Sequence, residues 1–325
     1  MTGTPSSPRR FPLVWSSQYE VNIGAHVFPT TKYRLVLNDL LARRVVRKED
    51  VLQPEPASWE EVGQVHSRRY LETVRNGTLS FAEQMTLEVP FSPELREAFL
   101  LCCGGTTLAA RKALREGVAA HLGGGFHHAF RDHGEGFCLL NDVAVAVATL
   151  FAEEKVERAA VVDLDVHQGN GTASIFADDP RVFTFSMHQE RNYPNPKPPS
   201  DLDLGLLDRT SDDHYLETLD GVLDLVLDEH QPQVAVYLAG ADPFMEDQLG
   251  GLALTKDGLE ARDRLVLERC RRAGVGVAVV LAGGYARRTR DTVEIHSRTI
   301  EAARDAWDGL ERRDCATRSD TRLGG

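Results

Sequence analysis

Residues 159–167 read AAVVDLDVH, an apolar run that carries three ionisable side chains, those of Asp163, Asp165 and His167. Apolar runs of this kind are typical of a buried strand in a parallel sheet. Side chains alternate between the two faces of a strand, so these three would share one face. Ionisable groups inside such a strand destabilise it unless they are paired with each other or bind a metal. The stretch therefore predicts a metal site, with a structural ion-pair network as the alternative.

Four other short apolar runs have the same character, and helical patterns separate them. The expected strands are 118–122, 159–166, 182–187, 234–239 and 275–282. The expected helices are 94–116, interrupted at Gly104-Gly105, then 143–155, 214–230 and 259–273. Asn141 and Asp142 offer an N-cap to the second of these helices. Strand and helix in alternation predict an α/β fold with an open parallel sheet and helices on its faces.

Glycine or ionisable residues follow each expected strand. In chain order the clusters are GGGFHHA (123–129), HQGNG (167–171), His188, GADP (240–243) and GGY (283–285). Ligands of open parallel sheets bind beyond the carboxyl ends of the strands. We therefore expect the five clusters to meet in one site.

A catalytic zinc site takes three protein ligands and keeps one position open. Asp165 and His167 can supply two ligands, and Asp242, just past an apolar strand, is the best third candidate. Considered alone, Asp242 would also suit a turn or an N-cap before Pro243. Oxygen-rich ligands suit iron(II) as well, so the spacing leaves the choice between Zn²⁺ and Fe²⁺ open.

His127 and His128 are adjacent and follow three glycines at a strand end. Adjacent residues rarely ligate one ion, so acid/base work is the better role for this pair. Asp163 and Asn170 are their natural orienting partners by chain position. Tyr285 at the last strand end could donate to a developing oxyanion, or it could simply pack there.

Composition narrows the function classes. The chain has 325 residues, with 49 acidic and 37 basic side chains and a net charge of -12. This balance argues against direct nucleic-acid binding, which needs a basic face, and leaves a cationic substrate open. No apolar run approaches the roughly 18 residues of a membrane span, and the N-terminus lacks the apolar segment of a secretory signal. The five cysteines form no CxxC pair, so we expect reduced thiols in a cytoplasmic protein.

No linker divides the chain. We expect a flexible N-terminus at 1–10, a single domain at 11–307 and a flexible C-terminal tail at 308–325, where apolar periodicity ends.

Six segments, in this order, resemble the zinc-dependent histone deacetylase family. They are GGGFHHA (123–129), GFCLLND (136–142), VDLDVHQGNGT (162–172), FSMH (185–188), AGADPFMEDQLGGL (239–252) and LAGGY (281–285). Three further segments are most similar to class IV deacetylases and their bacterial relatives: HVFPTTKY (26–33), HSRRYL (66–71) and DQLGGLALTKDGL (247–259).

This resemblance implies the arginase/deacetylase fold, with about eight parallel strands. It implies zinc held by Asp165, His167 and Asp242, and a catalytic set of His127, His128 and Tyr285. It pairs His127 with Asp163 and His128 with Asn170, where some branches of the family have Asp. It implies substrate-binding residues Gly136, Phe137, Tyr193 and Gly283, with Phe137 and Tyr193 on opposite tunnel walls. Some members also hold K⁺, and the positions that match its ligands are Asp163, Asp165, His167, Ser186 and Met187.

The resemblance implies a metal-dependent amidohydrolase that removes acetyl or longer acyl groups from lysine side chains in proteins. The alternative substrates are acetylpolyamines or other small acylated amines. A non-catalytic module that binds acyl-lysine is the competitor from another class, and the complete set of His127, His128 and Tyr285 opposes it. Arginase shares the fold but needs further metal-binding carboxylates, which the single Asp242 does not supply.

Overall fold

The computed structural model describes residues 9–320, with side chains up to residue 309. The five apolar runs expected as strands form neighbouring strands at the centre of one sheet. They are β3 (Val118–His121), β4 (Ala159–Asp163), β5 (Val182–Gln189), β7 (Val234–Leu238) and β8 (Gly276–Val280). Three strands that the sequence analysis missed complete the edges: β1 (Leu13–Val14), β2 (Val51–Leu52) and β6 (Leu202–Leu206).

The sheet has eight strands in the order β2-β1-β3-β8-β7-β4-β5-β6, and every pair of neighbours is parallel. β8 is the last strand in the chain, but it lies between β3 and β7 in the middle of the sheet. The predicted open parallel α/β sheet is therefore confirmed.

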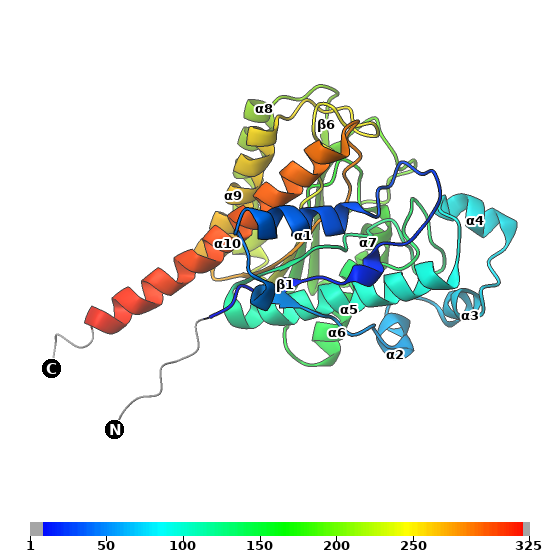
Figure 1. Ribbon diagram of the computed structural model, residues 1–325, viewed down its shortest axis with the longest axis horizontal. Coiled ribbons are helices and arrows are strands. Elements are labelled where there is room, and N and C mark those ends of the chain that lie inside the picture. The colour runs from blue at the N-terminus through cyan, green and yellow to red at the C-terminus, as the bar shows by residue number, and fades with distance from the viewer. Residues whose placement is uncertain (1–8, 321–325) are drawn as a thin grey trace.

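Helices cover both faces of the sheet (Figure 1). One layer contains α5 (Pro93–Glu116), α6 (Asp142–Ala152) and α7 (Asn170–Phe176). The other contains α1 (Lys32–Ala42), α8 (Asp212–Asp224), α9 (Lys256–Ala273) and α10 (Thr289–Asp320). Three short helices, α2 (Trp59–Gly63), α3 (Arg68–Asn76) and α4 (Phe81–Leu87), lie at one end of the molecule. No helix in the described residues is long and apolar enough to cross a membrane.

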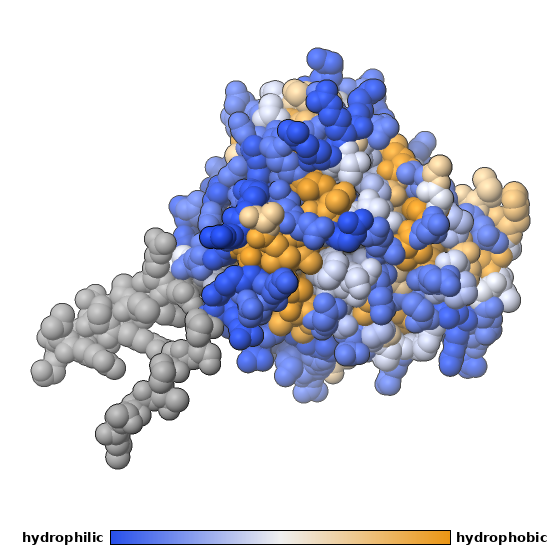
Figure 2. Space-filling model, in the orientation of Figure 1, coloured by the Kyte–Doolittle hydropathy of each residue, from blue (hydrophilic) through white to orange (hydrophobic). Residues whose placement is uncertain are grey.

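The surface in Figure 2 is largely hydrophilic, in keeping with the charged composition. Phe81 and Met85 of α4 are exceptions, with 80% and 60% of their surface exposed. They lie at the end of the molecule where Figure 2 shows an apolar area.

The prediction that the 94–116 helix is interrupted at Gly104-Gly105 was wrong, since α5 runs through both glycines without a break. The two glycines serve close packing instead. A Cβ atom on Gly104 would lie 1.8 Å from the carbonyl oxygen of Glu55, and one on Gly105 would lie 2.5 Å from the ring of His121. Their missing side chains let the helix approach its neighbours closely, and the rest of the helix compensates for their low propensity.

The strand expected over 159–166 ends at Asp163. Beyond that point carboxylates accept the backbone hydrogen bonds. Asp163 accepts from the N–H of Asp165, and Asp165 accepts from the N–H of His167. Asp165 and His167 therefore lie in the loop after β4. Their side-chain directions follow from the loop and not from the alternation of a strand.

The chain termini fall partly outside the described residues. Residues 1–8 and 321–325 are not described, so the expected flexibility there stays a prediction. The expected tail at 308–325 begins within α10, which continues to Asp320. Loss of apolar periodicity does not end a helix that contains no proline and many good helix formers.

Candidate functional site

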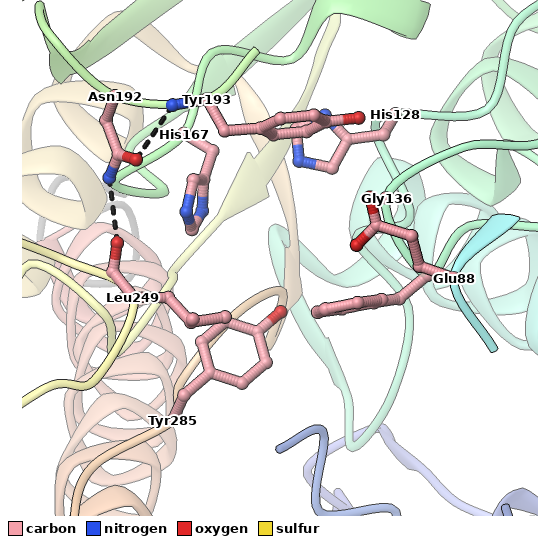
Figure 3. Close-up of a pocket in the computed structure, with 9 residues that line it drawn as sticks. Glu88, His128, Gly136, His167, Asn192, Tyr193, Leu249 and Tyr285 are labelled. Atoms are coloured by element: carbon pink, nitrogen blue, oxygen red, sulfur yellow. Dashed lines mark hydrogen bonds between the residues drawn. The ribbon is translucent and has the colours of Figure 1, made fainter. Parts of the chain in front are cut away.

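A cavity of about 190 Å³ opens beyond the carboxyl ends of the central strands. Its lining residues, shown in Figure 3, are Glu88, His128, Gly136, Phe137, His167, Asn192, Tyr193, Leu249 and Tyr285. The sequence analysis named six of these. It missed Glu88, Asn192 and Leu249, which lie on loops and belong to no charged cluster in the sequence.

Asp165, His167 and Asp242 converge beneath this cavity. All three side chains are buried, and they can each offer one ligand atom within 4.8 Å of the others. Nδ1 of His167 lies 3.0 Å from Oδ1 of Asp165 and 3.5 Å from Oδ2 of Asp242. The first two follow β4 and the third follows β7, and these strands are neighbours in the sheet. The cluster therefore results directly from the parallel topology.

The donor set fits a divalent cation. Oδ1 of Asp242 accepts from the N–H of Val166, at 2.9 Å, but its Oδ2 is buried and has no hydrogen-bond partner. A buried carboxylate oxygen without a partner is costly. Gly283 keeps this oxygen accessible, because a Cβ atom there would lie 1.9 Å from it. Two carboxylates and one imidazole suit Zn²⁺ or Fe²⁺.

Burial raises the pKa of Asp165, but His127 and His167 lower it well below its usual range, so this carboxylate is ionised. Without a cation the other two groups take up protons. Burial lowers the pKa of His167, but Asp165 and Asp242 raise it to about 10. Burial and the charge of Asp165 raise the pKa of Asp242 to about 7. A metal must displace such protons, because it binds deprotonated ligands.

Gly283, which the resemblance implies binds substrate, makes two backbone hydrogen bonds within the protein. Its N–H donates to Oδ2 of Asp165, at 2.7 Å, and its carbonyl accepts from the N–H of Ala241, at 3.0 Å. Both of its backbone polar groups are thus used within the protein. It lines a small cavity deeper than the main one. A direct contact with substrate stays a prediction.

His127 and His128 each have the orienting partner expected from the sequence. Nδ1 of His127 lies 2.6 Å from Oδ2 of Asp163. Nδ1 of His128 lies 2.7 Å from Oδ1 of Asn170, the first residue of α7. The two Nε2 atoms are 3.1 Å apart, so only one of them carries a proton between them.

The two histidines titrate in opposite directions. Burial lowers the pKa of His127, but the charges of Asp163 and Asp165 raise it to about 9. Burial, and then the positive charges of His127 and His167, hold the pKa of His128 well below its usual range. Near neutral pH His127 is therefore cationic and His128 is a neutral imidazole. His128, not His127, lines the main cavity.

Tyr285 lies across the cavity from His128 (Figure 3). Its N–H donates to Oδ2 of Asp247, at 2.6 Å, which fixes the backbone at the end of the β8 loop. Burial, followed by the negative charges of Asp165 and Asp242, raises the pKa of the Tyr285 hydroxyl well above its usual range. The group therefore stays protonated and can donate a hydrogen bond.

Aromatic rings form the walls. Phe137 lies edge-to-face with Tyr285, with 6.0 Å between ring centroids. Tyr193 lies edge-to-face with His128, at 4.9 Å. Asn192 holds this second wall, since its side chain accepts from the N–H of Tyr193 and donates to the carbonyl of Leu249. Phe137 and Tyr193 thus both line the cavity, and their role as opposite walls of a substrate tunnel stays a prediction.

Lys32 is a buried cation that the sequence analysis did not single out. Its Nζ donates to the carbonyl of Ala282, at 2.6 Å, and lies 5.9 Å from the ring centroid of Tyr285. Burial lowers the pKa of Lys32 to about 8, against the opposing effect of Asp242 and Asp165. A lysine early in α1 carries no sequence signal that connects it with residues some 130 to 250 positions later.

Comparisons with known proteins agree with this arrangement. The histone deacetylase domain model matches residues 26–300. An uncharacterized protein of Picosynechococcus is 44% identical over 300 residues, which cover 91% of this chain and 99% of that protein. Histone deacetylase 2 of Arabidopsis thaliana is 30% identical, over 88% of this chain and 78% of the plant protein. The crystal structure of an HDAC homologue complexed with SAHA superposes with a TM-score of 0.78 and 25% identity, over 91% of this chain and 84% of that one. The fold is therefore that of the arginase/deacetylase superfamily.

Proposed function

The chain belongs to the histone deacetylase family, and from that premise we propose that it hydrolyses acyl-lysine side chains in proteins. The observation that carries the proposal is the arrangement around one cavity. A neutral imidazole, His128, and a protonated hydroxyl, Tyr285, lie on either side of a buried carboxylate–imidazole cluster. Hydrolysis of an amide needs this combination of a base and an oxyanion donor.

In this proposal Asp165, His167 and Asp242 hold a zinc ion, with iron(II) as the alternative. When bound, such an ion polarises the amide carbonyl and lowers the pKa of water. Asp163 and Ser186 are register partners on β4 and β5, which supports a K⁺ ion beside Asp163, Asp165, His167, Ser186 and Met187.

The remaining steps belong to residues of the chain. Phe137 and Tyr193 align the aliphatic part of the lysine between them, and Gly136 leaves room at the entrance. His128 accepts the proton of the attacking water at Nε2 and passes it to the leaving amine. His127 stays charged beside Asp163 and stabilises negative charge near the amide. Tyr285 donates a hydrogen bond to the oxyanion that forms from the carbonyl oxygen.

The proposal extends to the organisation of the chain and its setting. Residues 11–307 act as one catalytic domain, which the family match to 26–300 supports. The four described cysteines are buried free thiols, in keeping with a cytoplasmic enzyme. The excess of acidic residues supports a protein that does not bind nucleic acid directly.

One observation favours a second substrate class. The carboxylate of Glu88 lines the entrance of the cavity, where it would attract the distant ammonium group of an acetylated polyamine.

A substrate panel tests the proposal. Zinc-loaded and iron(II)-loaded enzyme is assayed with an acetyl-lysine peptide, a long-chain acyl-lysine peptide and acetylated polyamines. Asp242→Ala is the matched inactive control. We expect turnover of at least one acyl-lysine peptide. Turnover of polyamines alone would move the enzyme to the second class. Binding of an acyl-lysine peptide with no turnover by either metal form would favour the non-catalytic module.

A further inference from the structure

Glu135 connects two residues of the candidate site. One is Asn170, the partner of His128, and the other is Tyr193, which lines the cavity. Oε1 of Glu135 accepts a hydrogen bond from Nδ2 of Asn170, at 2.6 Å, and another from the hydroxyl of Tyr193, also at 2.6 Å. Only 18% of the Glu135 side chain is exposed. Partial burial raises the pKa of Glu135. Hydrogen bonds from His133, Tyr193 and Asn170 have the opposite and larger effect, so its pKa lies below the ordinary value. The carboxylate is therefore ionised and acts only as an acceptor.

The first hydrogen bond determines which way the Asn170 amide faces. A carboxylate can face only the NH₂ side of an amide, so the oxygen of Asn170 must point away from Glu135. That oxygen lies 2.7 Å from Nδ1 of His128 and can only accept from it. His128 must then carry its proton on Nδ1. Its Nε2 then carries no proton; it accepts from Nε2–H of His127, at 3.1 Å, and is the basic nitrogen that a general base requires.

The second hydrogen bond determines where the Tyr193 ring lies. Tyr193 belongs to the loop between β5 and β6, and the Glu135 bond ties its outer end to the loop before α6. Gly136 makes this close approach feasible, since a Cβ atom there would lie 2.8 Å from the His128 ring and 2.9 Å from the Tyr193 hydroxyl. A groove of about 500 Å³ lies beyond, lined by Glu135, Tyr193 and neighbouring residues. Tyr193 lines both this groove and the main cavity.

The backbone holds Glu135 firmly in place. Glu135 and Cys138 exchange two backbone hydrogen bonds, of 3.1 and 2.9 Å. The two residues between them, Gly136 and Phe137, have φ angles of 54° and 70°. Positive φ at both central positions is the mark of a tight type I′ turn. The turn thus presents Glu135 to Asn170 and Tyr193 and the Phe137 ring to the cavity.

We propose that Glu135 is a positioning residue that selects the Nδ1–H tautomer of His128 through Asn170 and holds Tyr193 as a wall of the substrate entrance. This inference rests on the proposed deacylase function. It adds one residue, remote from the reacting atoms, that controls both the base and the entrance.

The first test compares two substitutions of Glu135 on a substrate that the wild type hydrolyses. Glu135→Ala removes the acceptor, and kcat should fall about 10- to 100-fold, the usual loss when an orienting partner is removed. Glu135→Gln keeps an acceptor oxygen and should recover most of kcat. Asp132→Ala is the matched control, because Asp132 is an exposed carboxylate on the same loop that contacts His133. Unchanged kcat in Glu135→Ala, with melting temperature unchanged, would overturn the proposal.

A charge swap tests the direct contact with Asn170. Asn170→Asp replaces the donor by a second acceptor opposite Glu135 and should reduce kcat strongly. Adding Glu135→Gln to that variant restores a donor–acceptor pair, and the double variant should be more active than Asn170→Asp alone. Additive losses would contradict the contact, because coupled residues must show an interaction energy in such a cycle.

The third test does not depend on turnover. Two-bond ¹H–¹⁵N spectra of zinc-loaded, ¹⁵N-histidine-labelled protein distinguish the two imidazole tautomers, and His128→Gln identifies the signal. We expect Nδ1–H in the wild type and in Glu135→Gln, and a mixture in Glu135→Ala. Tyr193→Phe should raise KM more than it lowers kcat, and should weaken binding of an alkyl hydroxamate. A pure Nδ1–H tautomer in Glu135→Ala would refute the proposed role.

These outcomes separate the two proposals. If no acyl-lysine substrate is turned over by the wild type, the function fails, but the tautomer spectra still test Glu135. If the wild type is active and the spectra of Glu135→Ala are unchanged, only the role of Glu135 fails.

Discussion

His127 and His128 are adjacent in the chain, yet their surroundings give them opposite protonation states. Asp163 and Asp165 supply negative charge to His127, whereas His128 faces a neutral amide and two other histidines. Pairs of titratable groups with opposed environments commonly divide acid and base roles between them. In the proposed reaction this difference leaves the unprotonated Nε2 to His128, the member of the pair that reaches the cavity.

At Tyr285 a single oxygen atom can be tested. Tyr285→Phe keeps the ring, which contacts Phe137, and removes the hydroxyl that would donate to the oxyanion. We expect kcat to fall roughly 10²- to 10³-fold, the loss typical of one such donor, with melting temperature and metal content nearly unchanged. Steady-state kinetics and thermal melts check this. Tyr215→Phe, which removes a buried hydroxyl on α8, is the control. A large drop in melting temperature with normal turnover would make Tyr285 a packing residue.

At Asp242 the prediction concerns metal content. Asp242→Ala removes the carboxylate whose Oδ2 has no other partner. Two remaining ligands hold zinc poorly, so bound metal and activity should both be lost. Elemental analysis of the purified protein, with Glu246→Ala as an exposed nearby control, measures the effect. Full activity with normal metal content in Asp242→Ala would reject the ligand set.

The site residues that sequence analysis identified are those with unusual neighbours in the chain. Asp163, Asp165 and His167 stand out within an apolar run, as do two histidines after three glycines. Glu135, Lys32 and Asp247 do not stand out, because each is an ordinary charged residue in a polar or amphipathic segment. Their roles arise from contacts between segments 35 or more positions apart, which chain position alone does not reveal.

At the scale of elements, strand prediction depended on length and burial. The five central strands are buried on both faces and are visible in the sequence as short, mostly apolar runs. β1 and β2 have two residues each, too few for any period to appear. β6 reads LDLGL and is only partly buried at the edge of the sheet. Its alternation is real, but it lies in a loop-like region rich in proline, glycine and aspartate.

His66 connects the segment before α3 with the start of α6, and its burial makes the stability of the fold depend on pH. It precedes α3, its Nδ1 donates to the carbonyl of Phe130, and its Nε2 accepts from the N–H of Asn141 at the start of α6. Burial lowers the pKa of His66 to about 4, and burial lowers that of His121 to about 3. Both side chains are neutral in the folded protein.

Stability should therefore decrease in mild acid. Below about pH 6.5 the unfolded chain takes up protons that the folded protein excludes. The contribution is complete above pH 6.5 and is lost as pH falls toward 4, at about 1.4 kcal/mol per pH unit for each histidine. Urea titrations between pH 7 and pH 4.5 measure it. His66→Gln should be less stable at pH 7 and have a shallower pH slope, with exposed His214→Gln as control. An identical slope in both variants would exclude His66 as a source.

At the scale of the whole molecule, the candidate metal site joins the ends of strands that are far apart in the sequence. Asp165 and Asp242 follow β4 and β7, and Gly283 after β8 donates to Asp165. A ligand that binds only the folded state stabilises it by an amount that grows with the logarithm of its concentration, roughly 2.7 kcal/mol at 100 times its Kd.

Zinc added to metal-free protein should accordingly raise the melting temperature by several degrees. A chelator should reverse the shift, and Asp242→Ala should show none. Differential scanning calorimetry measures all three. A shift of equal size in Asp242→Ala would place the stabilising zinc elsewhere on the protein.

The central place of β8 also bears on how the chain is synthesised. Until residues 276–280 have left the ribosome, β8 cannot join β3 to β7, and the sheet remains in two parts, β2-β1-β3 and β7-β4-β5-β6. Each part exposes an apolar strand edge, a feature that invites aggregation. His127 and His128 follow β3 in one part, and the candidate metal ligands Asp165, His167 and Asp242 lie in the other. In a nascent chain the candidate site therefore stays incomplete, and two strand edges stay exposed, until its last strand inserts.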